Sequence, residues 1–288
     1  MFFIENDYLR INLITRGAEL KSIYNKIENR ELLWQADPQF WGKSSPVLFP
    51  IVGALKDDCY FYNDKRYTMS RHGFARDNVF EIIYSDKSKI EFELKSNNKF
   101  KVIYPFDFHL KISYQLVEKS LLVNYNVINN SETDEIYFSL GAHPAFCVGN
   151  TSEEFSDYKL TFNLDNSLTT ILLENNLLMD DINAIELVER NLLLNYNLFE
   201  NDALVMHGLK SDEIVLSHNL KGDLFKFSFQ NFPYFGIWTV QGANFICLEP
   251  WAGVADSWNH NQQLKEKEGI NKLNPLASWE GSWNISVL

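Results

Sequence analysis

Three short blocks of the sequence each place an ionisable residue among residues that form turns. The blocks are RHGFAR at 71–76, GAHPAF at 141–146 and LEPWAG at 248–253. The chain has only 6 histidines, and two of them, His72 and His143, fall in these blocks, while the third block supplies Glu249. Two imidazoles and one carboxylate are sufficient for paired acid–base chemistry on a small molecule. They are also a possible ligand set for a metal ion.

His143 and Glu249 are each followed by a proline, and each follows a strand-like run, at 135–140 and 245–248. A residue before proline is restricted to extended backbone angles. We therefore expect both side chains to be held stiffly at the end of a strand. Stiffness favours catalysis, because a misplacement of about 1 Å can cost on the order of a hundredfold in rate. In the alternative interpretation, His143 is a hydrogen-bonded core histidine and Glu249 is a loop carboxylate paired with a lysine.

His72 lies in a block that has an arginine at each end and a glycine, Gly73, beside the histidine. Glycine lets backbone or ligand approach closely. The flanking guanidinium groups of Arg71 and Arg76 suit a ligand that is anionic or rich in hydroxyl groups. The alternative is a basic turn at the surface.

The elements around these blocks show an alternation of apolar and polar residues. It is clear in the segments 9–13, 90–94, 108–116, 123–127, 158–164 and 225–229. A period of two predicts strands with one buried face, whereas helical periodicity is limited to 38–41 and 193–202. The content of 45% hydrophobic residues in 288 fills a large core, and β-sandwiches of this length are often one domain. We predict an all-β fold, a large antiparallel sandwich or barrel, as a single domain over residues 1–288.

Composition and charge exclude several classes of protein. The net charge of -12 argues against a nucleic-acid partner, which requires clustered Lys and Arg. Three cysteines without CxxC spacing indicate neither a disulfide framework nor a zinc site. No apolar run is long enough to span a membrane and no signal peptide is recognisable, so we expect a cytoplasmic protein. The oligomeric state is left open between monomer and homodimer.

Taken together and in this order, the blocks resemble the aldose 1-epimerase (galactose mutarotase) family, and most closely its LacX-type subgroup. The resemblance implies a β-sandwich of the galactose mutarotase type that uses no cofactor and no metal. It implies that His143 is the general acid and Glu249 the general base. By the same resemblance, His72 positions the sugar near its ring oxygen. Asp202, in FENDA at 199–203, is similar to the family aspartate that binds sugar hydroxyls.

The sequence also departs from the family at residues that bind the substrate. Galactose mutarotases carry an Asn-Arg pair ahead of the histidine block, and the corresponding stretch here, 46–53, has no arginine. In the phosphosugar branch one arginine ends the histidine block, which Arg76 matches. A second arginine is expected where this chain offers only Lys43 nearby. The substrate class therefore stays open between an aldose and a sugar phosphate.

Three functions are consistent with these residues. The first is a mutarotase that interconverts the α and β anomers of an aldose or sugar phosphate by acid–base ring opening. The second is a non-catalytic carbohydrate-binding or sensing protein that has the same pocket. The third is a metal enzyme with two histidines and one carboxylate as ligands, which the missing His-x-His spacing and the arginines beside His72 disfavour. The resemblance favours the first.

Overall fold

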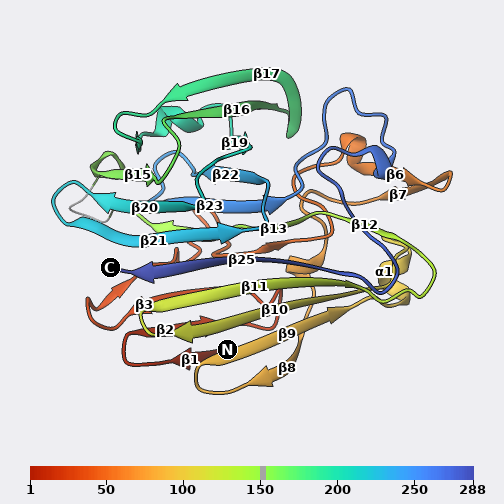
Figure 1. The fold of residues 1–288 in the computed structure, drawn as a ribbon, viewed down its shortest axis with the longest axis horizontal. Coiled ribbons are helices and arrows are strands. Elements are labelled where there is room, and N and C mark those ends of the chain that lie inside the picture. Colours follow the sequence, from red (N-terminus) through yellow and green to blue (C-terminus); the bar gives the residue numbers. More distant parts are fainter. Residues whose placement is uncertain (150–153) are drawn as a thin grey trace.

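Strands form most of the computed structural model of this protein, which describes residues 1–149 and 154–288 (Figure 1). The larger sheet has the order β18-β15-β20-β21-β25-β11-β10-β9-β8. Its strands are β8 (Glu81–Ser85), β9 (Lys89–Lys95), β10 (Phe108–Val117), β11 (Ser120–Asn129), β15 (Tyr158–Phe162), β18 (Asn191–Leu193), β20 (Glu213–His218), β21 (Gly222–Gln230) and β25 (Ser278–Val287). Neighbouring strands in it pair antiparallel.

The second sheet has the order β17-β16-β19-β22-β23-β13-β5, and β14 also pairs with β23. Its strands are β5 (Val47–Leu48), β13 (Leu140–Ala142), β14 (Ala145–Cys147), β16 (Ser167–Glu174), β17 (Leu177–Glu186), β19 (Leu204–His207), β22 (Tyr234–Trp238) and β23 (Phe245–Ala252). This sheet is antiparallel as well.

The remaining strands and helices form smaller elements. One sheet consists of β1 (Phe2–Glu5), β2 (Leu9–Leu13), β3 (Leu20–Asn25) and β4 (Arg30–Glu31). Two strand pairs are formed by β6 (Cys59–Tyr62) with β7 (Lys65–Thr68), and by β12 (Ile136–Phe138) with β24 (Asn271–Leu273). The helical pieces are α1 (Asn98–Lys101) and the 3-10 turns η1 (Lys56–Asp58), η2 (Ala75–Asp77), η3 (Phe155–Asp157), η4 (Tyr196–Phe199) and η5 (Leu264–Glu266).

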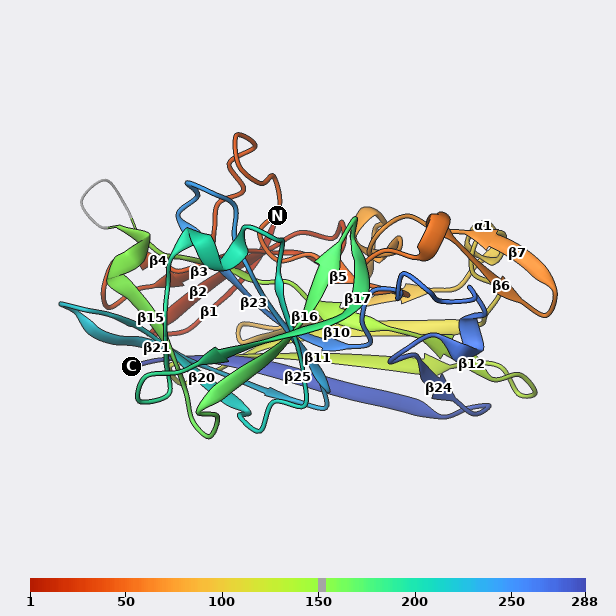
Figure 2. The ribbon, with the colours of Figure 1, turned by 90° about the horizontal axis from the view of Figure 1, so that it is seen from above.

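Aromatic side chains join the two main sheets face to face. Phe227 of β21 lies 6.3 Å from Phe235 of β22, and Phe146 of β14 lies 4.7 Å from Phe225 of β21, measured between ring centroids. Figure 2 shows β11 and β25 in one layer with β5 and β23 in the layer beside it. The predicted all-β class and antiparallel β-sandwich are confirmed.

The alternation in the sequence predicts the strands well and the helices poorly. Segment 108–116 forms β10, in which the buried and partly buried residues alternate as expected. Segment 38–41 is a single turn, closed by the N–H groups of Phe40 and Trp41 on the carbonyl of Asp37. Segment 193–202 begins in β18 and contains only η4. Both segments are too short to repay the cost of nucleating an α-helix.

Strand β23 presents two different faces to its surroundings, although all of its residues are buried. Ile246, Leu248 and Ala252 belong to the main core between the sheets. Glu249 and Trp251, with the opposite parity, therefore lie on the outer face of the second sheet.

The prediction that the strand ends before Glu249 is wrong, because β23 continues through Pro250. This is possible because β14 pairs with 245–247 and β13 with 251–252. The N–H that Pro250 lacks is therefore not required by either strand.

Two glycines make room for Trp251 on that outer face. Gly141 of β13 is the register partner of Trp251, and Gly236 of β22 is the partner of Glu249. A Cβ atom at Gly141 would lie 2.7 Å from the indole, and one at Gly236 would lie 2.6 Å from it. The indole can therefore lie close against both neighbouring strands only because neither has a side chain there.

We predict that Gly236→Ala destabilises the protein by about 1–3 kcal/mol, because the new methyl group must displace the Trp251 ring. Urea unfolding measures this loss. Gly42→Ala is the matched control, since no atom lies within 4 Å of a Cβ placed there. Equal free energies of unfolding for the two variants would contradict the packing described.

Candidate active site

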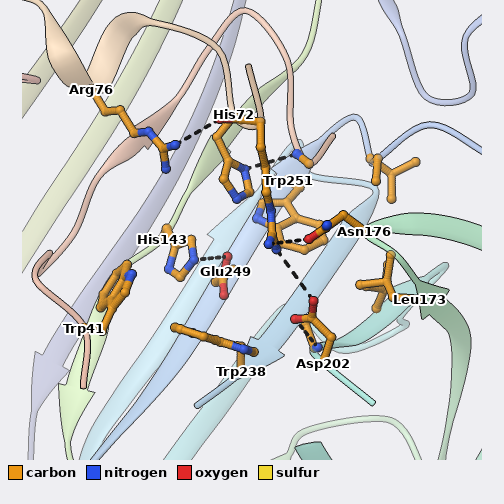
Figure 3. A pocket seen from close by; sticks show the side chains of 16 residues that line it. Trp41, His72, Arg76, His143, Leu173, Asn176, Asp202, Trp238, Glu249 and Trp251 are labelled. Carbon is orange, nitrogen blue, oxygen red and sulfur yellow. Dashed lines mark hydrogen bonds and ion pairs between the residues drawn. The ribbon is translucent and has the colours of Figure 1, made fainter. Parts of the chain in front are cut away.

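A cavity of about 250 Å³ lies on the outer face of the second sheet, with Trp251 in its wall. All the site residues expected from the sequence line it, although they come from segments far apart in the chain (Figure 3). They are His72, Arg76, His143, Asp202 and Glu249. The structure thus brings the three blocks together around one cavity.

His143 and Glu249 lie in contact at the wall of this cavity. His143 directly follows β13, as expected, and Glu249 lies within β23. Nε2 of His143 is 3.3 Å from Oε2 of Glu249, and the two residues are only 8% and 1% exposed. Among the residues that the structure describes, no group forms a hydrogen bond to Oε2 of Glu249.

His72 is fixed by two hydrogen bonds to one residue. Its backbone N–H donates to the carbonyl of Gly53 (2.8 Å), and the N–H of Gly53 donates to Nδ1 of His72 (3.1 Å). Because Nδ1 accepts, the proton of the neutral ring lies on Nε2. Burial lowers the pKa of His72 well below its ordinary value, and the charges of Arg71 and Arg76 lower it further. His72 therefore offers a neutral N–H donor.

Arg71 and Asp202 form a polar side of the cavity together with Asn176. Nη1 of Arg71 donates to Oδ1 of Asn176 at 2.6 Å, and Nη2 lies 3.8 Å from Oδ2 of Asp202. The sequence indicates Arg71 as a guanidinium suited to an anionic or hydroxyl-rich ligand, whereas Asn176 has no recognisable signal. Asn176 lies in the turn between β16 and β17, so only the folded hairpin places it beside Arg71.

Two tryptophans of the cavity wall contact the His143 ring. The indole of Trp41 stacks on the His143 ring, with centroids 4.8 Å apart, and Trp238 meets the same ring edge-on at 5.7 Å. Figure 3 shows Trp41 on one side of the His143–Glu249 pair and Asp202 on the other. Such aromatic faces suit the apolar C–H surface of a sugar ring.

Arg76 lies at the edge of the cavity among other charges. Its Nη2 donates to the carbonyl of Arg71 at 2.9 Å, and its Nε lies 3.8 Å from Asp77. Lys43 and Arg16 approach the same Asp77 carboxylate, at 3.6 and 3.5 Å. Three cations thus share one anion, and Lys43 is near Arg76 without lining the cavity.

The comparisons with known proteins agree on one family. The sequence matches the family model described as aldose 1-epimerase over residues 2–270. The chain belongs to the aldose 1-epimerase family. It is 32% identical to the plasmid-encoded Protein LacX of Lactococcus lactis subsp. lactis, over 99% of this chain and 98% of that protein. The expected family and its LacX-type subgroup are confirmed.

Solved structures show the same relationship. A galactose mutarotase related enzyme from Lactobacillus acidophilus superimposes with a TM-score of 0.93 at 31% identity, covering 100% of this chain and 97% of that one. A galactose mutarotase-like protein from Lactobacillus casei ATCC 334 has a TM-score of 0.90 at 28% identity, with both chains covered fully. The fold is the galactose mutarotase type of β-sandwich. Within residues 1–149 and 154–288, no helix is long and apolar enough to cross a membrane.

Burial controls the protonation of the pair in this member of the aldose 1-epimerase family. It lowers the pKa of His143 to about 3 and raises the pKa of Glu249 well above its ordinary value. The positive charge of Arg71 opposes the shift at Glu249. Both shifts favour the uncharged forms of the two side chains. The acid and base roles expected from the sequence require the opposite, a protonated His143 and an ionised Glu249, 3.3 Å apart.

Cys247 adds a third potential metal ligand beside the pair. Ligand atoms of His143, Cys247 and Glu249 all lie within 4.8 Å of one another. This set differs from the two histidines and one carboxylate that the sequence suggests as a metal site. Burial raises the pKa values of Cys247 and Glu249, which disfavours the deprotonated forms that a metal ion binds.

A buried ionic cluster holds the loop that completes the cavity wall. The Asp256 carboxylate accepts the N–H of Lys56 at 3.0 Å and lies 2.9 Å from Nδ1 of His260 and 3.7 Å from Nζ of Lys267. Lys267 also donates to the carbonyl of Val254, which lines the cavity. Burial lowers the pKa of Lys267 to about 8.

We predict that the His143 imidazole of the free protein stays neutral between about pH 5 and about pH 8. Its pKa is depressed, so protonation begins only as the pH falls toward about 3. NMR of the imidazole nitrogens measures this. A titration midpoint near the ordinary value of 6.5 would contradict the burial of the ring.

Proposed function

We propose that this protein is an aldose 1-epimerase (mutarotase) that interconverts the anomers of an aldose or sugar phosphate without a cofactor. The observation that carries the proposal is the 3.3 Å separation of His143 and Glu249 at the wall of one cavity. The ring oxygen and the anomeric hydroxyl are bonded to the same carbon. An acid and a base that act on these two oxygens must therefore lie side by side, as this pair does.

The reaction opens and recloses the sugar ring by two proton transfers. Glu249 as carboxylate takes the proton of the anomeric hydroxyl, and a carbonyl forms at that carbon. The bond from this carbon to the ring oxygen breaks, and its electron pair goes to the ring oxygen, which takes a proton from His143. Rotation of the open aldehyde end and reversal of both transfers give the other anomer. No net proton is gained or lost.

The cycle begins with a protonated His143 and an ionised Glu249. Sugar hydroxyls that donate to Glu249 favour its carboxylate form, as does the positive charge of Arg71. The ionised Glu249, 3.3 Å away, in turn favours the protonated form of His143. The N–H of His72 is free to donate to a sugar oxygen.

We predict that Glu249→Gln lowers the rate of anomer interconversion by about 100-fold or more, because the amide cannot accept the proton. NMR exchange spectroscopy on a panel of hexoses, pentoses and their 6-phosphates measures this rate. Glu132→Gln, at an exposed turn, is the matched control and should keep full activity. The wild-type rate should also survive treatment with a chelator.

Two outcomes would count against the proposal. An unaltered rate in Glu249→Gln on the sugar that the wild type turns over fastest removes Glu249 from the mechanism. Sugar binding without anomer exchange for any member of the panel would indicate a sugar-binding protein instead.

Arg76 decides between the two substrate classes. We predict that Arg76→Ala lowers kcat/KM for a sugar phosphate about tenfold more than for the parent aldose, because a guanidinium forms charge-assisted hydrogen bonds with phosphate. Anomer exchange rates on both substrates measure the difference. Equal losses on the two would show that Arg76 does not bind a phosphate and would favour the neutral sugar.

A further inference from the structure

Arg71 has hydrogen-bonding capacity that its protein partners do not use. A guanidinium group carries five N–H donors. Within the described part of the chain, the Arg71 side chain has Asn176 and Asp202 as its only acceptor partners. The side chain is 45% exposed and lines the cavity. The remaining donors are therefore open to a ligand.

The position of this guanidinium is fixed by segments remote from it in sequence. Asn176 is 105 residues away, in the turn of the β16–β17 hairpin seen at the top of Figure 1. Asp202 lies just before β19, and its Oδ1 accepts the N–H of Ala203 at 2.8 Å. Both residues have positive φ angles, 66° and 81°. A side chain tethered at two points loses little further entropy when it binds a ligand.

A guanidinium beside a carboxylate is matched to a pair of neighbouring hydroxyl groups. Arg71 can only donate, and an ionised Asp202 can only accept. One hydroxyl can therefore accept from Arg71 while its neighbour donates to Asp202. Figure 3 places Asn176 and Asp202 on the side of the His143–Glu249 pair that is opposite Trp41.

We propose that Arg71, tethered by Asn176, determines substrate specificity by binding the ring hydroxyl next to the one that the family resemblance assigns to Asp202. The inference rests on the proposed function, because it concerns the same cavity. It also explains how the chain manages without an arginine in 46–53: the guanidinium enters the cavity from the residue before His72. The charge of Arg71 favours the carboxylate form of Glu249 in addition.

The test combines removal of the residue with removal of the hydroxyl. Wild type and Arg71→Ala are compared on the sugar that the wild type binds best and on each of its monodeoxy analogues. Dissociation constants come from calorimetry and exchange rates from NMR. For one analogue, we expect the wild type to lose about 10- to 100-fold in affinity. Arg71→Ala should show the same loss on the parent sugar and no further loss on that analogue.

Further variants separate the role of Arg71 from general damage to the fold. Asn176→Ala should raise KM more than it lowers kcat, and Asn176→Asp, which keeps an acceptor for Arg71, should restore KM. Arg71→Lys should lose most of the affinity, since lysine has no fork of donors. Arg190→Ala is the matched control, because Arg190 is an exposed arginine that donates to the carbonyl of Asn163 away from the cavity.

Each outcome decides between the two proposals. The role of Arg71 is overturned if Arg71→Ala binds the sugar as tightly as the wild type. It is also overturned if, for every analogue, the loss of affinity from Arg71→Ala multiplies with the loss from removing the hydroxyl. Both conclusions hold whatever the rate of anomer exchange. If removing Arg71 and removing one hydroxyl cause the same, non-additive loss of affinity but the wild type exchanges no anomers, Arg71 is confirmed as a binding residue. In that case the mutarotase proposal fails. If no sugar of the panel binds, both are overturned.

Discussion

The site depends on the burial of one carboxylate in the middle of a β-strand. Glu249 is 1% exposed, and an unpaired charge in that position is unfavourable by several kcal/mol. Burial therefore favours the protonated carboxyl, while the positive charge of Arg71 favours the ionised one. His143 lies 3.3 Å from the same carboxyl, and burial favours its neutral form.

The burial of Glu249 is itself a consequence of sheet geometry. Even-numbered residues of strand β23 face the core, whereas the odd-numbered residues Glu249 and Trp251 line the cavity. A carboxylate at position 249 must therefore face the cavity. Gly141 and Gly236 let the indole of Trp251 lie against the sheet beside it. The register of three strands, more than any single contact, therefore determines the shape of the cavity wall.

The prediction of secondary structure succeeded where the apolar–polar pattern extends over many residues and failed where it covers only a few. The alternation through β10 was sufficient to predict a strand, whereas 38–41 and 193–202 mimic helices over a turn or two without forming them. The prediction that Glu249 ends its strand failed for a different reason. Proline normally interrupts pairing, but here the neighbouring strands β13 and β14 leave a gap where Pro250 lies.

The sequence alone determined the family, the fold class and which residue types could perform the chemistry, because short motifs and alternation are local properties of the chain. Only the tertiary structure decided that the pKa of His143 is lowered and that of Glu249 raised, since both shifts depend on the exclusion of water. It also decided that Arg71 and Asn176 meet, because their contact crosses 105 residues and has no signature in either segment. Local sequence patterns therefore determine the strands and the motif residues. Long-range packing determines which of these residues meet and how burial shifts their pKa values.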